Sequence, residues 1–97
     1  MNKYIYKVIK WLEDPDSVSQ EERDKNKEEA KKSLDSIYAT YATHNDASIL
    51  DASYAAYSSA YFAADNDQEA AARWVNNYFE ETGEDKQDYI NAIGGEK

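Results

Sequence analysis

Residues 46–64 read DASILDASYAAYSSAYFAA, and this stretch decides the fold. At the 100° per residue of an α-helix, its large side chains form one narrow stripe and its small ones gather on the opposite side. The large stripe consists of Leu50, Tyr54, Tyr57 and Tyr61, and the small side of Ala52, Ala55, Ala56, Ser59 and Ala63. No charged residue occurs in residues 52–64. Because a helix without a charged face is normally buried on more than one side, these residues are predicted to form the central helix.

The two sides of this helix have different expected neighbours. We expect the tyrosine rings to lie in the core and their hydroxyls at its rim, because a buried tyrosine hydroxyl needs a partner or water. The small Ala/Ser side is expected to let another helix approach closely. The same side is a candidate contact face between two copies of the chain, which would make the protein a structural homo-oligomer.

The residues before the central helix show two further helical patterns. Residues 2–13 are amphipathic, and Asp14-Pro15 ends them because proline disfavours helical geometry in the residue before it. Ser19 and Glu22 have the spacing of a capping box, so a second helix is expected to begin there. Its first half, residues 21–32, is almost wholly polar and is predicted to be solvated. Apolar periodicity in residues 30–42 predicts that only the second half contributes to the core, and residues 43–46 mark the predicted helix end.

The residues after the central helix predict two more helices. Asp65-Asn66-Asp67 are three cap-forming residues, which favour a break over one long bent helix. Gly83 suits the left-handed position after a helix C-terminus, and Asp85 can cap a short fifth helix that Gly94-Gly95 ends. The sequence therefore predicts an all-α fold. Residues 1–97 are expected to form a single domain, a compact bundle of four to five helices around residues 46–64.

The net charge of −9 is unevenly distributed along the chain. Residues 1–32 hold eight basic and eight acidic side chains, whereas residues 33–97 hold three basic and twelve acidic ones. Because such a surface repels phosphates, we expect no direct binding to nucleic acid or to a membrane, and a bacterial protein with a basic surface as the partner. The alternative is that the charge only maintains solubility. The chain has no cysteine and no apolar run near the roughly 20 residues that span a bilayer, so we expect a cytoplasmic location.

Acidic residues gather at both ends of the predicted fourth helix. They are Asp65, Asp67, Glu69, Glu80, Glu81, Glu84, Asp85 and Asp88. Carboxylates spaced over helices can imitate a phosphate backbone and occupy a basic groove, which makes this set the candidate partner-binding surface. A solvated face is the alternative interpretation. An EF-hand would need Gly and Glu where Ala70 and Asn76 stand, so the first three acids are expected to cap a helix and to bind no metal.

A second hypothesis assigns ligand binding to the aromatic residues. A planar, nucleotide-like ligand would stack among Tyr54, Tyr57, Tyr61, Trp74 and Tyr78, and its phosphate would be neutralised by Arg73 or by the basic stripe of Lys3, Lys7 and Lys10. Core packing of the same rings is the alternative. His44, the sole histidine, is expected to be a surface turn residue. Since no nucleophile, metal-ligand or phosphate-loop spacing is found, we expect no enzyme and no cofactor.

Three stretches carry a family resemblance: WLEDPDSVSQEE at 11–22, YAAYSSAYFAAD at 54–65 and WVNNYFEETGEDKQDYINAI at 74–93. They are similar to small Ala/Tyr-rich helical proteins of phages and bacteria that are labelled immunity proteins. The polar, Lys- and Glu-rich second helix departs from the most alanine-rich of these proteins. The resemblance brings no catalytic residues, and it implies a phage-encoded protein that interferes with a host or competing function. Our leading hypothesis is therefore a non-enzymatic inhibitor of a bacterial host or defence protein, bound through the acidic helical surface.

Overall fold

The computed structural model describes residues 1–44 and 47–96 of the chain. In these residues the elements are α1 (Lys3–Glu13), a 3-10 turn η1 (Pro15–Ser17), α2 (Gln20–His44), α3 (Ala47–Ala64), α4 (Gln68–Thr82) and α5 (Lys86–Gly95). The described residues contain five α-helices and no strand. The predicted all-α bundle is confirmed.

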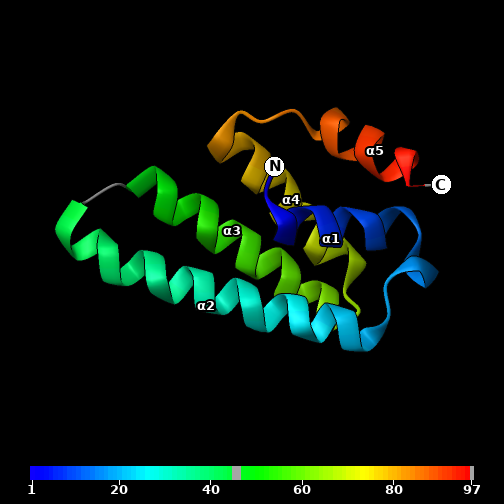
Figure 1. Cartoon of the computed structure of the whole chain (residues 1–97), viewed down its shortest axis with the longest axis horizontal. Helices are drawn as coiled ribbons and strands as arrows, with labels where there is room; N and C mark the ends of the chain where they lie inside the picture. The colour runs from blue at the N-terminus through cyan, green and yellow to red at the C-terminus, as the bar shows by residue number, and fades with distance from the viewer. Residues whose placement is uncertain (45–46, 97) are drawn as a thin grey trace.

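α2, α3 and α4 form a layer, and α1 covers one face of this layer (Figure 1). α3 lies between α2 and α4 and packs against both, and α1 packs against all three of them. α5 packs on α1, so the last helix of the chain lies against the first. The molecule measures 42 × 26 × 22 Å. The α2–α3 hairpin extends beyond α1 along the longest of these dimensions. α3 is therefore the central helix of the bundle, as its composition predicts.

Polar side chains begin four of the helices, where the first backbone N–H groups lack partners within the helix. Asn2, Ser19, Asp67 and Asp85 accept these N–H groups at the starts of α1, α2, α4 and α5. The predicted capping box at α2 is only half formed. The Ser19 Oγ accepts from the Glu22 N–H at 3.1 Å, but the Glu22 carboxylate accepts from the Ser19 hydroxyl at 3.4 Å and lies 3.6 Å from the Lys7 Nζ.

The break between α3 and α4 is confirmed. Asn66 has a φ of 61° and therefore lies in the left-handed region, which asparagine tolerates better than most residues. The Asp67 N–H donates to the Phe62 carbonyl at 2.9 Å and closes the end of α3. Gly83 has a φ of 72° after α4, at the left-handed position predicted for it.

The structure confirms the close approach of other helices on the small side of α3, but it contradicts the predicted burial of the Tyr54 and Tyr61 rings. The small residues of α3 form the core, together with α1, Val18 and Val75, whereas the Tyr54 and Tyr61 side chains are 45% and 41% exposed. The prediction that the tyrosine stripe is buried was therefore wrong. Three helices pack on the small side of α3, because alanine and serine let helix axes approach closely. Tyr54 and Tyr61 are left facing outward, whereas Tyr57 is half-buried against the core.

This arrangement also excludes the Ala/Ser side as a contact between copies of the chain. Ala55, Ala56, Ser59 and Ala63 are all buried within one chain, and Ser59 is fully buried. Its hydroxyl donates to the Ala56 carbonyl at 2.8 Å. The homo-oligomer hypothesis was wrong about this face, because α1, α2 and α4 already cover it.

The two halves of α2 also differ from prediction. Arg23 and Asn26 in the polar first half are buried, because α1 lies over this half and the Asn26 amide donates to the Tyr4 carbonyl at 3.1 Å. In the apolar second half Leu34 is buried, but Tyr38 is 50% exposed because the hairpin extends past α1 there. The first half therefore contributes more to the core than the sequence predicts.

Arg23 joins three elements at the open end of the α2–α3 hairpin, where α2 begins and α3 ends. Its Nη1 donates to the Ala63 carbonyl at 2.8 Å and to the Asn66 Oδ1 at 2.5 Å, and its guanidinium lies 4.9 Å from the centre of the Trp11 ring. No carboxylate of the described residues pairs with it. The C-terminal end of α3 supplies the partial negative charge instead, since the last carbonyls of a helix carry it.

Candidate functional site

The exposed stripe of α3 borders a shallow hollow beside α4. Its volume is about 290 Å³, and it is lined by Tyr54, Tyr57, Ser58, Tyr61, Phe62 and Trp74, which we call the aromatic hollow. The rings meet edge to face: the Tyr54 and Trp74 centroids are 5.5 Å apart, and those of Tyr57 and Tyr61 are 6.2 Å apart. Edge-to-face contacts hold such rings in fixed orientations. The hollow therefore has a defined shape although it is open to solvent.

Polar atoms at the rim of the aromatic hollow are unused within the chain. Among the described residues, neither the hydroxyls of Tyr54, Tyr57 and Tyr61 nor the Trp74 indole N–H makes a hydrogen bond to the protein. The Lys27 Nζ lies 5.3 Å from the Tyr61 ring centroid, on the α2 side. The hollow thus offers aromatic faces together with free hydrogen-bond donors. This is the combination for which tyrosine and tryptophan are enriched at interfaces.

The structure brings together only part of the predicted ligand set. Tyr54, Tyr57, Tyr61 and Trp74 line the hollow, but Tyr78 is buried elsewhere and its hydroxyl donates to Glu84. Arg73 is not among the lining residues and pairs with Glu69 at 2.9 Å. The sequence analysis missed Ser58, Phe62 and Lys27. Ser58 and Phe62 follow Tyr54 by four and eight residues, so helical periodicity was the signal for both.

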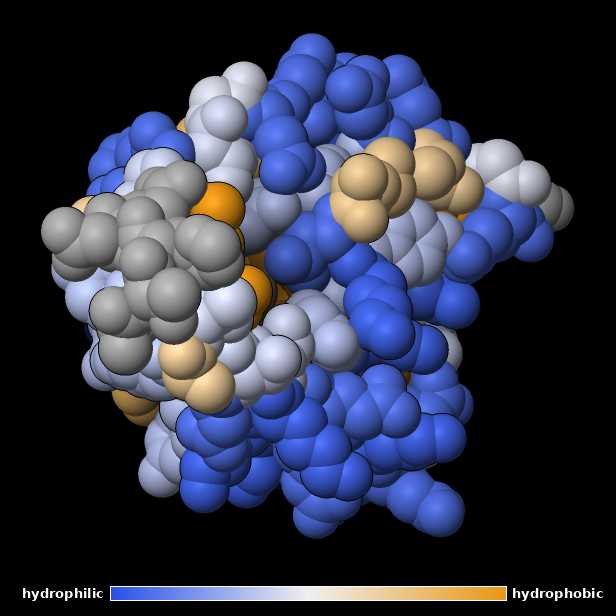
Figure 2. Space-filling model, turned by 60° about the vertical axis from the view of Figure 1, so that its left-hand side comes forward, coloured by the Kyte–Doolittle hydropathy of each residue, from blue (hydrophilic) through white to orange (hydrophobic). Residues whose placement is uncertain are grey.

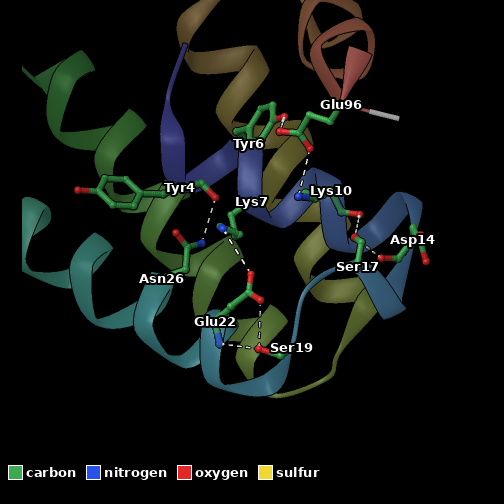
Figure 3. Close-up of polar contacts among 10 residues, drawn as sticks. All are labelled: Tyr4, Tyr6, Lys7, Lys10, Asp14, Ser17, Ser19, Glu22, Asn26 and Glu96. Atoms are coloured by element: carbon green, nitrogen blue, oxygen red, sulfur yellow. Dashed lines mark hydrogen bonds and ion pairs between the residues drawn. The ribbon is translucent and has the colours of Figure 1, made fainter. Parts of the chain in front are cut away.

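The basic stripe of α1 does not line the aromatic hollow, and its Lys7 and Lys10 are already paired (Figure 3). The Lys7 Nζ is 3.6 Å from Glu22 of α2, and the Lys10 Nζ is 3.1 Å from Glu96 beyond α5. The Tyr6 hydroxyl donates to the same Glu96 carboxylate, and this hydrogen bond lowers the pKa of Glu96. Lys3 lies over the Tyr4 ring. The stripe therefore attaches α2 and α5 to α1 and offers no phosphate site at the tyrosines.

The eight acidic candidates do not form one surface. Asp65, Asp67 and Glu69 lie around the start of α4, and the other five lie at its end, in the loop to α5 and, for Asp88, in the first turn of α5. Glu69 and Glu80, the nearest members of the two groups along α4, are eleven residues apart, which is about 16.5 Å at 1.5 Å per residue. Asp67 and Asp85 cap helices, Glu69 pairs with Arg73, and Glu84 accepts two tyrosine hydroxyls. Half of the set therefore has a structural role within the chain.

The surface around the hairpin end is mainly hydrophilic, with a few apolar openings (Figure 2). Apolar atoms, in orange, are visible at the bottom of a recess beside the hairpin end, and blue hydrophilic side chains surround it. Tyr38, Ile49, Tyr54 and Tyr61 of the α2–α3 hairpin are among the most exposed large hydrophobic residues. Apolar exposure is thus concentrated on α2 and α3 and is not spread over the molecule.

Comparison with known proteins leaves the function open. No protein-family model, curated protein or solved structure matches the chain. The resemblance to phage and bacterial immunity proteins therefore stays a prediction.

Few features of the described residues favour catalysis or metal binding. No group of three or more His, Cys, Asp or Glu side chains in residues 1–44 and 47–96 is arranged to hold a metal ion. His44 ends α2, and its side chain lies outside the described residues, as does the rest of the predicted turn at 45–46. Within the described helices, none is both long and apolar enough to cross a membrane.

Buried tyrosines join α4, α5 and the N-terminus. The Glu84 carboxylate accepts from the Tyr78 hydroxyl at 2.7 Å and from the Tyr89 hydroxyl at 2.5 Å, and Tyr89 Oη accepts from the Asn2 N–H at 2.8 Å. Burial is the largest cause that raises the pKa of Tyr78 and Tyr89, followed by their hydrogen bonds to Glu84. The hydrogen bond to Glu96 raises the pKa of Tyr6 to about 12.

These pKa shifts predict a loss of stability in alkali. The folded state holds the tyrosine protons more tightly than the unfolded state, in which the pKa is near 10.0. We therefore expect the free energy of unfolding to be unaffected by these groups below about pH 10 and to fall as the pH rises toward 12. Urea unfolding measured at several pH values tests this. Tyr89→Phe should flatten the alkaline limb, whereas Tyr61→Phe at the surface should leave it unchanged; equal curves for both would contradict the assignment.

Proposed function

We propose that this chain is a non-enzymatic protein-binding domain that engages its partner through the aromatic hollow and the carboxylates beside it. One observation supports this most strongly. On α3 the buried side consists of alanine and serine, while the large Tyr54 and Tyr61 side chains of the same helix are each more than 40% exposed. Burying two such side chains on a partner would contribute about 1.5–3 kcal/mol each, so their exposure is costly unless a partner covers them.

The carboxylates beside the hollow give the proposed surface a negative charge. Asp51 precedes Tyr54 by one helical turn, Asp65 follows Tyr61 by one turn, and Glu81 follows Trp74 by two turns. All three are exposed. Asp65 and Glu81 belong to the predicted acidic set, so part of that prediction is kept in a smaller form. A basic protein surface remains the proposed partner, and inhibition of a bacterial protein is the role that the family resemblance implies.

A capture experiment with surface variants tests this function. The tagged chain is incubated with bacterial lysate at low and high salt, beside Tyr54→Ala/Tyr61→Ala and a matched Tyr38→Ala control. We expect a partner that the double variant loses and the control retains, with weaker capture at high salt because charge contributes. The activity of the captured protein is then assayed with and without the chain. Capture that is unchanged by the double variant would contradict the proposed surface.

A further inference from the structure

The spacing of the tyrosines along the aromatic hollow is close to the repeat of one kind of extended peptide. Tyr54 and Tyr61 are seven residues apart on α3, so their rows are separated by about 10.5 Å along the helix axis. A polyproline II helix repeats every three residues, which is about 9.3 Å. Two prolines one turn apart in such a peptide can therefore reach both tyrosine rows, and the two residues between them pass Tyr57.

The chemistry of the hollow also suits proline. Proline rings are compact, apolar and conformationally restricted, and they can pack on the exposed surfaces of aromatic rings such as Tyr54 and Trp74, which are held edge to face at 72°. The carbonyl groups of a polyproline II helix have no internal hydrogen bonds. They can accept from the free tyrosine hydroxyls and the Trp74 N–H at the rim. Aromatic-lined grooves recognise proline-rich segments by this combination.

The carboxylates at the two ends of the tyrosine row indicate which charge the two ends of the ligand should carry. Asp51 and Asp65 lie at opposite ends of the tyrosine row, and the Asp65 N–H still donates to the Tyr61 carbonyl at 3.1 Å, so it continues the helical turn. Fourteen residues of helix separate these carboxylates by about 21 Å. About seven residue steps of polyproline II span the same distance.

We infer that the aromatic hollow binds a proline-rich segment in the polyproline II conformation, about six prolines long and with a lysine or arginine at each end. This inference rests on the proposed function, because it names the chemical class of the partner. A nucleotide base is a poor alternative: residues 33–97, which supply every lining residue, carry twelve acidic side chains against three basic ones and repel phosphate. A second copy of the chain cannot supply the ligand, since its single proline, Pro15, lies in η1.

The test uses the whole chain and synthetic peptides in isothermal titration calorimetry. The probe is six prolines between two lysines, and the matched control replaces the prolines with alternating glycine and serine at the same charge. We expect the proline peptide to bind at least tenfold more tightly. Tyr54→Ala should weaken it about tenfold, whereas Tyr38→Ala, which changes a tyrosine outside the hollow, should not. Asp51→Asn/Asp65→Asn should weaken the peptide with lysine ends and leave one with uncharged ends unchanged.

Amide chemical shifts locate the peptide and decide between occupants. We expect shifts concentrated in α3 and α4 around the hollow. The inference is overturned if both peptides bind equally or not at all, if a nucleoside monophosphate shifts the same residues more strongly, or if light scattering shows a dimer that Tyr54→Ala dissociates. If the proline peptide fails while lysate capture still depends on Tyr54 and Tyr61, only the ligand class is wrong. If capture is also independent of them, the proposed function fails as well.

Discussion

Arg23→Ala is expected to lower the free energy of unfolding by about 3 kcal/mol. The substitution removes two hydrogen bonds from a charged donor, each worth about 1.5–3 kcal/mol, and the contact of the guanidinium with the Trp11 ring. It also leaves the buried Ala63 carbonyl without this donor. Part of the loss is offset, because the folded state no longer has to bury a charge that lacks a carboxylate partner.

Thermal and urea unfolding measure this effect against a matched control. For a domain of this size, about 3 kcal/mol corresponds to a fall in Tm of more than about 10 °C. Arg73→Ala removes the other arginine, whose side chain is 68% exposed and paired with Glu69 across one helical turn. Its loss should cost less than about 0.5 kcal/mol. If the two variants are equally stable, Arg23 does not hold the end of the hairpin as described.

Ala60→Leu is expected to destabilise the chain by about 3 kcal/mol or more. Ala60 is fully buried on the small side of α3, where α1, α2 and α4 pack. A larger side chain forces the helices apart or takes an unfavourable rotamer, and such overpacking typically costs about 1–3 kcal/mol. We expect the upper part of that range because Ala60 lies where the neighbouring helices approach α3 closely.

Two comparisons isolate the packing effect in the same unfolding measurements. Ala39→Leu makes the same change at an exposed position of α2 and should alter stability by less than about 0.5 kcal/mol. Ala60→Gly should cost about 2 kcal/mol, because the usual helix penalty of glycine, about 1 kcal/mol, adds to the loss of one buried methyl group, about 0.8 kcal/mol. A chain that tolerates leucine at residue 60 as well as at residue 39 would show that the core is loosely packed and that the small residues have another purpose.

Local chemistry predicted most of the helix boundaries. Asp14-Pro15 ends α1, Asp67 and Asp85 cap α4 and α5, and Gly83 takes the left-handed position after α4. These features depend on hydrogen bonds and backbone angles within a few residues, so they can be read along the chain. The break after α3 was predictable for the same reason, because Asn66 tolerates the left-handed region.

The candidate site was predicted only in part. Periodicity placed Tyr54, Tyr57 and Tyr61 on one side of α3, and the structure confirms that they lie together. Whether that side faces the core or solvent was predicted wrongly, because hydrophobicity alone assigns large rings to the interior. Arg23 and Glu96 had no sequence signal at all, since their partners Ala63 and Tyr6 lie 40 and 90 residues away.

The sequence by itself determined the helical fold, the order and most of the ends of the helices, and the two-sided character of α3. The tertiary structure decided which side of α3 became the core. Three helices compete for contact with one, and the side that lets all of them approach closely is the small one, so the alanines are buried and the tyrosines remain outside. The aromatic hollow follows from that choice, because it is the surface left over when the alanine side is buried.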